Sequence, residues 1–432
     1  MAPQPLSTLQ SLLDDALAET PPGRSIWVAL SGGLDSCLLV TLAAKVGKQA
    51  NRCVRAIHIN HGLQAAAQTF EAHSRALCER LNVPLTVVNV TVAVQGQGVE
   101  GAARNARYAA FYATLAAGDA LWLAQHQDDQ AETFLLAALR GSGLRGLAGM
   151  PYRRESQGIT LVRPWLSARR AELEAAARSL TLTWCEDPTN ADISLDRNRL
   201  RHRVLPELHE RWPGAARALA SSAAHAYEAD AVLGEYVAAE LAGLMTNDGQ
   251  VDADALNRCS RPRQRLLVRA LCQRQGLPTP PQKRLESLLE QLTAKADAVV
   301  CIEWSGAQAR LWRQRLYVMA RLEPLPAWDV FWDGQAPLET PLGRLGWQVD
   351  CSQRLRVTWR QGGEVIQLPG RGRRDLKRLL QEASVPPWER ERLAVVMQAK
   401  ACIGVISPPD RLLWQAEGFE FTSQPSPASP QD

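Results

Sequence analysis

A six-residue loop near the start of the chain most limits what this sequence can fold into. It follows an apolar run at residues 25–30 that is typical of a buried parallel strand, and residues 36–46 after it have the pattern of a helix. Glycines let the backbone approach a phosphate closely, and the amides that open a helix carry partial positive charge. The sequence therefore predicts a nucleotide-phosphate site here. The loop is Ser31-Gly32-Gly33-Leu34-Asp35-Ser36.

Apolar strand-like segments alternate with helix-like segments through the first 140 residues. The predicted strands are residues 25–30, 54–59, 85–92 and 120–124. The predicted helices between and after them are residues 36–46, 65–81, 101–117 and 129–139. Such alternation is typical of an α/β fold with a parallel sheet covered on both faces.

The pattern changes twice further along. We expect a catalytic domain at 1–210, a mainly helical domain at 211–325 and a small α+β domain at 345–422. Residues 299–320 look like paired strands, and residues 321–345, rich in proline, tryptophan and glycine, look like a linker. The tail at 423–432 is low in complexity, and we expect it to be disordered.

The loop differs from the two commonest nucleotide fingerprints. No GxxxxGK[ST] occurs, and no GxGxxG follows a strand. SGGLDS resembles instead the PP-loop of the ATP pyrophosphatases, which cleave ATP between its α and β phosphates and adenylate a substrate. The resemblance implies an adenine nucleotide α-hydrolase-like fold and ATP as cosubstrate, with Asp35 assisting Mg²⁺ at the phosphates.

A second acidic segment opens the predicted helix after the strand at 120–124. Asp129 and Glu132 are three residues apart and therefore share one helix face, next to His126 and Asp128. In such folds the carboxyl edge of the sheet is where ligands bind. Two carboxylates there suit Mg²⁺ or a cationic substrate, although acids at a helix start also serve simply to cap the helix.

Longer segments resemble one member of the superfamily, the tRNA(Ile)-lysidine synthetases. The resemblance extends over residues 25–210, with Trp165 and Thr189 as departures from the family pattern. The matching segments are 58–63 (HINHGL), 100–108 (EGAARNARY), 126–150 (HQDDQAETFLLAALRGSGLRGLAGM), 163–166 (RPWL), 186–190 (EDPTN) and 197–201 (RNRLR).

This resemblance implies a ligase that joins free L-lysine to C2 of the wobble cytidine in a tRNA(Ile) with a CAU anticodon. ATP first adenylates the cytidine; lysine then displaces AMP, and decoding changes from AUG to AUA. Residues 31–36 would hold ATP, and Asp129 and Glu132 would receive the lysine ammonium groups. Further catalytic candidates are His126, which would position ATP or the adenylate, Asp128, which would share in metal or lysine binding, and Arg104 and Arg107, which would steady phosphate charge.

Two basic regions are candidate tRNA contacts. Arginines alternate at 197, 199, 201 and 203, so that Arg197, Asn198 and Arg201 suit either an RNA backbone or a solvated helix face. Residues 351–400 hold eleven Lys or Arg and five Asp or Glu, a net +6 that exceeds the +4 of the whole chain. Segments there resemble the family's C-terminal domain, which grips the acceptor stem. Its candidate contacts are Arg371, Arg373, Arg374 and Lys377.

Two other function classes compete with this interpretation. A tRNA thiolase would need a cysteine pair, and Cys37 and Cys185 are not in a thiolase-like motif. An RNA-binding protein with a dead nucleotide site would not need SGGLDS. The odd count of 9 cysteines and the lack of a signal segment predict a cytoplasmic protein, and no apolar run is long enough for a membrane span. A homodimer is compatible with the sequence.

Overall fold

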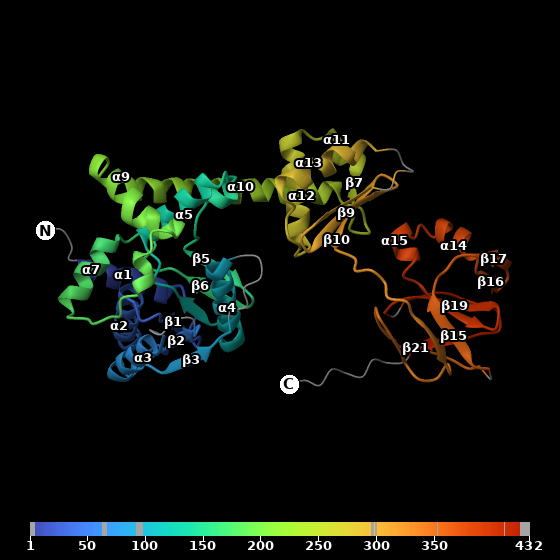
Figure 1. Ribbon diagram of the computed structural model, residues 1–432, viewed down its shortest axis with the longest axis horizontal. Helices are drawn as coiled ribbons and strands as arrows, with labels where there is room; N and C mark the ends of the chain where they lie inside the picture. The colour runs from blue at the N-terminus through green and yellow to red at the C-terminus, as the bar shows by residue number, and fades with distance from the viewer. Residues whose placement is uncertain are drawn as a thin grey trace. The chain divides into compact units, whose positions relative to one another are not determined.

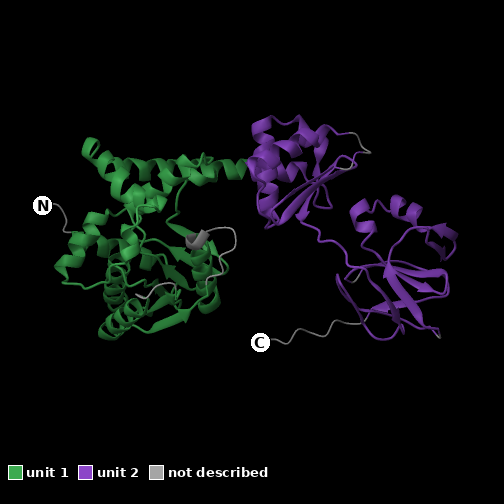
Figure 2. Ribbon diagram, in the orientation of Figure 1, with its two compact units in different colours: residues 1–236 green, residues 237–432 purple. Residues whose placement is uncertain are grey.

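The structure is a computed structural model, and many of its helices and strands are labelled in Figure 1. It describes residues 5–62, 67–91, 98–294, 298, 300–351, 353–409 and 411–423. Leu63 of the HINHGL segment and residues 424–432 of the predicted disordered tail lie outside the described residues. The chain divides into two compact units, residues 1–236 and 237–432, which are considered separately (Figure 2).

The first unit contains a six-stranded sheet in the order β3-β2-β1-β4-β6-β5. Its strands are β1 (Ile26–Ala29), β2 (Val54–Asn60), β3 (Leu85–Asn89), β4 (Ala120–Trp122), β5 (Arg153–Ser156) and β6 (Ile159–Val162). All pairings are parallel except that of β5, which forms an antiparallel hairpin with β6 at the edge. The predicted parallel-sheet α/β fold is confirmed, whereas β5 and β6 were not expected from the sequence.

The direction in which successive strands are added to this sheet reverses at β1. It passes from β1 outward through β2 to β3 and then returns to place β4 on the other side of β1, with Ile26 in register with both Val54 and Ala120. The loops after β1 and β4 therefore lie side by side at the carboxyl edge. Such a reversal is where parallel α/β sheets bind their ligands.

Helices cover both faces of this sheet (Figure 1). On one face, α1, α2 and α7 pack a core that includes Leu13, Leu38 and Leu173, each no more than 1% exposed. On the other face, Phe111 of α4 and Leu115, just after it, pack against the sheet. The helices and helical turns are α1 (Pro5–Ala18), α2 (Leu34–Gln49), α3 (Ala67–Leu81), α4 (Gly98–Thr114), α5 (Gln127–Leu139), α6 (Leu144–Leu147), α7 (Arg170–Ser179), η1 (Pro188–Ala191), α8 (Asp196–Arg199), η2 (Leu200–Val204), α9 (Leu205–Arg211) and α10 (Ala215–Leu244), whose last turns belong to the second unit.

Trp165, the departure from the family's RPLL pattern, has a structural explanation. Its side chain is fully buried in the α1–α2–α7 core, and its indole Nε1 donates to the Leu9 carbonyl of α1 at 3.2 Å. A buried indole needs such an acceptor. The larger side chain is thus accommodated by packing beneath α1.

The second unit begins with three helices and an antiparallel sheet of order β7-β10-β9-β8. The paired strands expected at residues 299–320 are β8, β9 and β10. The elements are β7 (Val251–Asp252), α11 (Ala253–Arg258), α12 (Arg261–Arg274), α13 (Gln282–Glu290), η3 (Gln291–Thr293), β8 (Val300–Trp304), β9 (Ala307–Trp312) and β10 (Arg315–Ala320).

The rest of the second unit is an α+β fold around a seven-stranded sheet. The linker expected at 321–345 instead contains β11, which pairs with β15 of this sheet, and the hairpin β12–β13. Trp328, just before β11, packs on Trp359 of β15, and this aromatic contact ties the segment to the sheet. The elements are β11 (Asp329–Trp332), β12 (Leu338–Thr340), β13 (Gly343–Leu345), β14 (Trp347–Val349), β15 (Leu355–Trp359), β16 (Val365–Leu368), β17 (Gly372–Asp375), α14 (Leu376–Glu382), α15 (Pro387–Arg390), β18 (Ala394–Gln398), β19 (Ala401–Ser407), β20 (Arg411–Gln415) and β21 (Phe421–Ser423).

Within the described part of the chain, none of the helices combines the length and the apolar character that crossing a bilayer requires.

Candidate active site

The loop between β1 and α2 is shaped by its two serines. The backbone amide of Ser31 donates to Oγ of Ser36 at 3.1 Å, and the Ser36 hydroxyl lies 3.0 Å from both Ser31 Oγ and the Gly33 carbonyl. Gly33 is the N-cap of α2 and has no side-chain cap, so the amides of the first turn face outward without an internal acceptor. An uncapped helix start of this kind suits a phosphate.

Gly32 is required by both its conformation and its surroundings. Its φ of +90° lies in a region that L side chains rarely adopt, and a Cβ added there would lie 2.8 Å from Cδ1 of Phe70 on α3. The carbonyl of Gly32 accepts from the Cys185 amide at 3.0 Å, which ties the loop to the segment before η1. The loop is therefore held from two sides in the shape that exposes its amides.

Three carboxylates surround one buried histidine where the loops after β1 and β4 meet. His126 is the N-cap of α5 and is fully buried; its Nε2 lies 3.8 Å from Oδ2 of Asp35 and 3.5 Å from Oδ2 of Asp129. Its Nδ1 lies 3.7 Å from Oδ2 of Asp128. Asp129 also accepts from the His126 backbone amide at 3.0 Å and so caps its own helix. The structure thus brings together the first turn of α2 and the start of α5.

The electrostatic environments of Asp35 and Asp129 differ. Burial raises the pKa of Asp35, and the Asp129 charge adds to this, while His126, Arg170 and Arg201 oppose it. Burial would raise the pKa of Asp129 too, but His126, Arg197 and Arg201 together hold it below its usual value. Asp35 is therefore the carboxylate of the pair that would gain more from an added cation.

Oδ1 of Asp35 is buried and has no hydrogen-bond partner among the described residues. Within the same part of the chain, no group of three or more His, Cys, Asp or Glu side chains is arranged to hold a metal unaided. Mg²⁺ in nucleotide sites is commonly held by one or two carboxylates, with phosphate oxygens and water completing its shell. The orphaned oxygen beside the phosphate loop fits that pattern.

Two arginines from α8 and the following turn pair with the acids of α5. Arg197 donates from Nε to Glu132 at 2.7 Å and from Nη2 to Asp129 at 3.1 Å. Arg201 donates from Nε to Glu132 at 2.6 Å and from Nη2 to Asp129 at 3.1 Å. Glu132 is fully buried, so its charge requires these partners. Burial alone would lower the pKa of both arginines, but the two carboxylates raise it.

The alternating arginines at positions 197–203 therefore lie on two different faces of this helical segment. Arg197 and Arg201 are four residues apart and share the face toward α5, whereas Arg199 and Arg203 are exposed. Residues 200–204 form a π-helical turn, η2, and such turns often occur at functional sites. The expectation that Arg197 and Arg201 contact RNA stays a prediction, and their carboxylate partners were not foreseen from the sequence.

Two further candidates are engaged by the protein itself. Asp128 accepts from the backbone amide of Arg170 at 2.9 Å and so joins the start of α7 to the site. Asn198 is buried, and its Nδ2 donates to the carbonyls of Thr189 and Asp192 at 2.8 and 3.0 Å. Asn198 thereby holds the EDPTN segment in place. A direct part for Asp128 in metal or lysine binding, or for Asn198 in tRNA binding, stays a prediction.

The two arginines of α4 point to different places. Arg107 lies close enough to His61, just after β2, to lower the pKa of that imidazole together with burial. Arg104 is exposed, with its guanidinium carbon 5.3 Å from the centroid of the Tyr108 ring. That Arg104 and Arg107 stabilise phosphate charge stays a prediction. Arg104 lies beside the Tyr108 ring, whereas Arg107 lies near His61.

The basic candidates of the C-terminal sheet lie at its β16–β17 edge. Arg371, Arg373, Arg374 and Lys377 are all exposed, and Asp375 caps α14 through the amides of Lys377 and Arg378. The Arg374 guanidinium donates to the Arg371 carbonyl at 3.1 Å. The carboxylate of Asp375, the acid nearest to them in sequence, thus accepts hydrogen bonds from backbone amides, and the four cationic side chains face solvent.

The cysteine arrangement gives no support to a thiolase. Cys37 is fully buried in α2, and burial raises the pKa of its thiol to about 12. A thiol with that pKa is neutral at pH 7 and a poor nucleophile. Cys185 is near enough to influence Cys37 electrostatically, but both are free thiols.

Taken together, a parallel sheet, an uncapped SGGLDS loop and a carboxylate-lined strand edge define an ATP-using enzyme of the PP-loop class. A family model described as "PP-loop domain" matches residues 5–208. Models described as "TilS substrate binding domain" and "TilS substrate C-terminal domain" match residues 252–317 and 355–407.

Full-length relatives define the family more narrowly. The chain is 44% identical to a tRNA(Ile)-lysidine synthase of Xanthomonas axonopodis pv. citri, over 88% of this chain and 89% of the relative. It is 41% identical to the tRNA(Ile)-lysidine synthase of Pseudomonas aeruginosa, over 94% of both chains. The chain belongs to the tRNA(Ile)-lysidine synthase family. Among solved structures, a U34-tRNA thiolase from Methanococcus maripaludis matches 52% of this chain and 79% of its own at 16% identity and a TM-score of 0.44.

Proposed function

We propose that the protein joins L-lysine to C2 of the wobble cytidine in tRNA(Ile) with a CAU anticodon. In the first step the cytidine O2 attacks the α-phosphate of ATP, and pyrophosphate leaves. In the second step the lysine amine attacks C2, and AMP leaves with the former O2. The observation that carries the proposal is the meeting of the SGGLDS loop with the Asp129–Glu132 pair at one strand edge, because adenylation and amine capture must share a site.

The phosphate loop and Asp35 would serve the first step. The outward amides of the first turn of α2 and the two serine hydroxyls suit the phosphates of ATP. Asp35, with its orphaned buried oxygen, would hold Mg²⁺ bound to those phosphates. The metal would neutralise phosphate charge, and Asp35 would fix its position.

Asp129 and Glu132 would serve the second step by receiving the lysine ammonium groups. The guanidiniums of Arg197 and Arg201 lie beside these acids, so the site presents both signs of charge. A free amino acid carries both signs as well, and its carboxylate would complement the arginines. This arrangement explains why the acids are paired with arginine and yet remain at a ligand-binding edge.

The decisive assay incubates the purified protein with this tRNA, ATP, Mg²⁺ and labelled lysine, and measures label in the tRNA. Omission of ATP or Mg²⁺, and a tRNA with a different base at the wobble position, serve as matched controls. Label in the CAU tRNA that depends on ATP and Mg²⁺ is the expected result. Folded protein that transfers no label would refute the proposal. Cytoplasmic location and the oligomeric state stay predictions.

A further inference from the structure

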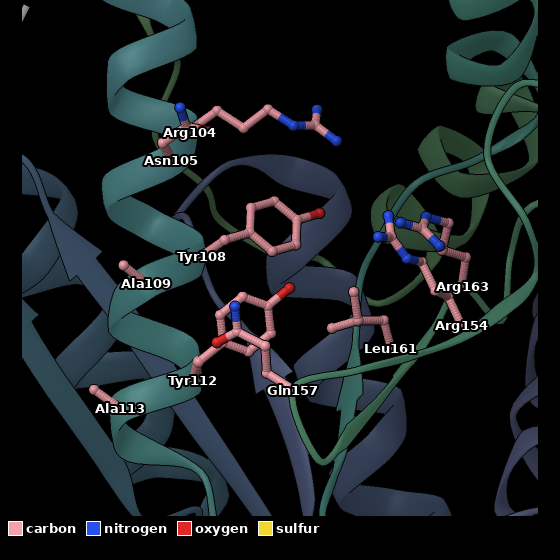
Figure 3. A pocket seen from close by; sticks show the side chains of 10 residues that line it. All are labelled: Arg104, Asn105, Tyr108, Ala109, Tyr112, Ala113, Arg154, Gln157, Leu161 and Arg163. Carbon is pink, nitrogen blue, oxygen red and sulfur yellow. The ribbon is translucent and has the colours of Figure 1, made fainter. Parts of the chain in front are cut away.

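Beside α4 lies a cavity of about 670 Å³ that the chemistry above does not use. Figure 3 shows α4 along one side and the β5–β6 hairpin residues opposite, with Leu161 of β6 between them. Phe111 of α4 and Leu115, just after it, are buried in the core on this face of the sheet, and Tyr108 and Tyr112 pack against that core on the side of α4 toward the hairpin. Its volume falls in the range of small-ligand sites.

The lining is cationic. Arg104, Arg154 and Arg163 contribute three guanidiniums, and none of the ten lining residues is acidic. Along β5 the side chains alternate: Arg153 pairs with Glu155, whereas Arg154 lines the cavity and Ser156 bonds the Tyr112 hydroxyl at 2.8 Å. The only acid on β5 is thus turned to the other face. Among the described side chains no carboxylate pairs with Arg104, Arg154 or Arg163, and guanidiniums that lack such partners suit phosphate.

The lining also offers flat surfaces. The ring centroids of Tyr108 and Tyr112 are 6.2 Å apart with 44° between their planes, and the Arg104 guanidinium lies 5.3 Å from the Tyr108 ring. Ala109 and Ala113 of α4 also line the cavity. Unpaired RNA bases stack on aromatic rings and on arginine planes. Phosphate-binding and base-stacking groups therefore occur together.

A direct contact links this cavity to the reaction centre. Arg163, only 3% exposed, follows β6 and donates from Nε to the side chain of Gln125 and from Nη1 to the Pro151 carbonyl at 2.7 Å. Gln125 immediately precedes His126. Arg163 and Gln125 therefore connect the lining of the cavity to the carboxylate cluster around His126.

We propose that this cavity binds one nucleotide of the anticodon loop next to the cytidine that reacts, with its base against Tyr108 and Tyr112 and its phosphate between Arg104 and Arg154. The proposal rests on the proposed function and adds a second RNA contact to it. A single-stranded loop that delivers its cytidine to His126 brings the flanking nucleotides to this side of the sheet. Their recognition helps to place the cytidine O2 for attack on ATP.

The test combines protein variants with modified RNA. Anticodon stem-loops that each carry one abasic nucleotide in the loop are titrated against the wild type, Arg154→Ala and Tyr112→Leu, and Kd is measured by fluorescence anisotropy. Stacking of a base contributes about 1–3 kcal/mol, so we expect one flanking abasic position to weaken wild-type binding roughly 5- to 150-fold. Tyr112→Leu should weaken binding of the intact loop similarly and should lose sensitivity to that one position.

Matched controls come from the same elements. Arg153→Ala removes a guanidinium from the opposite face of β5 and should leave Kd unchanged. Tyr112→Phe keeps the ring, loses only the bond to Ser156, and should keep its sensitivity to the abasic position, whether or not Tyr112→Leu folds well. The proposal is wrong if the effect of Tyr112→Leu on Kd adds to the effect of every abasic position. It is also wrong if Arg154→Ala and Arg153→Ala change Kd equally.

Three further outcomes distinguish a failure of this pocket from a failure of the proposed function. If the wild type transfers lysine to tRNA but shows no coupling between variants and abasic positions, the proposed function stands and the nucleotide pocket does not. If AMP or pyrophosphate protects Arg154 from arginine-specific modification while the stem-loop does not, the cavity is a small-anion site and the RNA proposal is wrong. If coupling in Kd is observed without lysine transfer, the pocket stands and the proposed function fails.

Discussion

Arg201 and Glu132 form the tightest contact of the candidate site, with Nε of the arginine 2.6 Å from Oε1 of the buried carboxylate. Residues 69 positions apart in sequence thereby join the π-helical turn η2 to α5. Removing one partner of a buried ion pair is far more costly than the net value of the pair. The contact consequently fixes where the carboxylate of Glu132 points, and it compensates the charge of that buried group.

The first prediction concerns the lysine subsite. Glu132→Gln keeps the side-chain shape but removes one of the two charges that would receive ammonium. A hydrogen bond to a charged group contributes about 1.5–3 kcal/mol, so we expect KM for lysine to rise roughly 10- to 150-fold. Adenylation, measured as tRNA-dependent pyrophosphate release without lysine, should fall much less.

Glu174→Gln is the matched control for that substitution. Glu174 also contacts two arginines, Arg170 at 3.1 Å and Arg178 at 3.5 Å, but on the surface of α7. Surface pairs of this kind contribute about 0–1 kcal/mol, so the control should leave lysine kinetics unchanged. An unaltered KM for lysine in folded Glu132→Gln would exclude the role assigned to Glu132.

A feature of this site could be predicted from the sequence only where residues that are close together in the chain determine it. The SGGLDS loop and the acids of α5 were predictable because a strand, a turn and a helix start are local patterns. The pairing of Arg197 and Arg201 with those acids was not, because it depends on how α8 and η2 dock 65–72 residues away. The alternating arginines at positions 197–203 also look like one basic surface in the sequence, but in a helical segment every second arginine lies on the opposite face.

The hairpin β5–β6 shows the same limit. Its strands have four residues each, and β5 reads Arg-Arg-Glu-Ser, which carries no apolar alternation. β5 exists because it pairs antiparallel with β6 at the sheet edge, which is a tertiary effect. The cavity beside α4 consequently could not be predicted, although Arg104 and Tyr108 were both visible in the EGAARNARY segment.

A second prediction tests the shape of the phosphate loop. Gly32→Ala would place a Cβ 2.8 Å from Phe70 at a φ of +90°, so the loop must shift. Strain of this kind costs about 1–3 kcal/mol, and we expect KM for ATP to rise roughly tenfold or more. Gly276→Ala, at φ +68° with open space around it, is the control for backbone strain alone. It should lower the unfolding free energy without changing KM for ATP, and an equal ATP defect in both variants would contradict the assignment.

A third prediction follows from the raised pKa of Asp35. Because burial favours the protonated form in the folded state, stability linked to this group is fully present below the unfolded pKa, near 3.8, and is lost as pH rises through the folded value. Asp35→Asn should therefore unfold at a higher urea concentration than the wild type at pH 7, while its ATP-dependent adenylation fails. The stability difference should shrink as pH approaches 3.8. A variant that is less stable at pH 7 would show that Asp35 supports the fold rather than a ligand.

A fourth prediction tests the basic edge of the C-terminal sheet. Arg373→Ala combined with Arg374→Ala removes two exposed charges near β17, and Arg169→Ala combined with Arg178→Ala removes two exposed charges from α7 as the control. If the edge grips the acceptor stem, only the first pair should weaken binding of full-length tRNA. The slope of log Kd against log salt should fall by roughly 0.7–0.9 for each phosphate that the variant no longer neutralises. An anticodon stem-loop lacks the acceptor stem, so its Kd should not respond to either pair, and kcat at saturating tRNA should stay at the wild-type level. An equal loss with the stem-loop would mean that these arginines act on RNA nonspecifically or through the first unit, and the acceptor-stem assignment would be wrong.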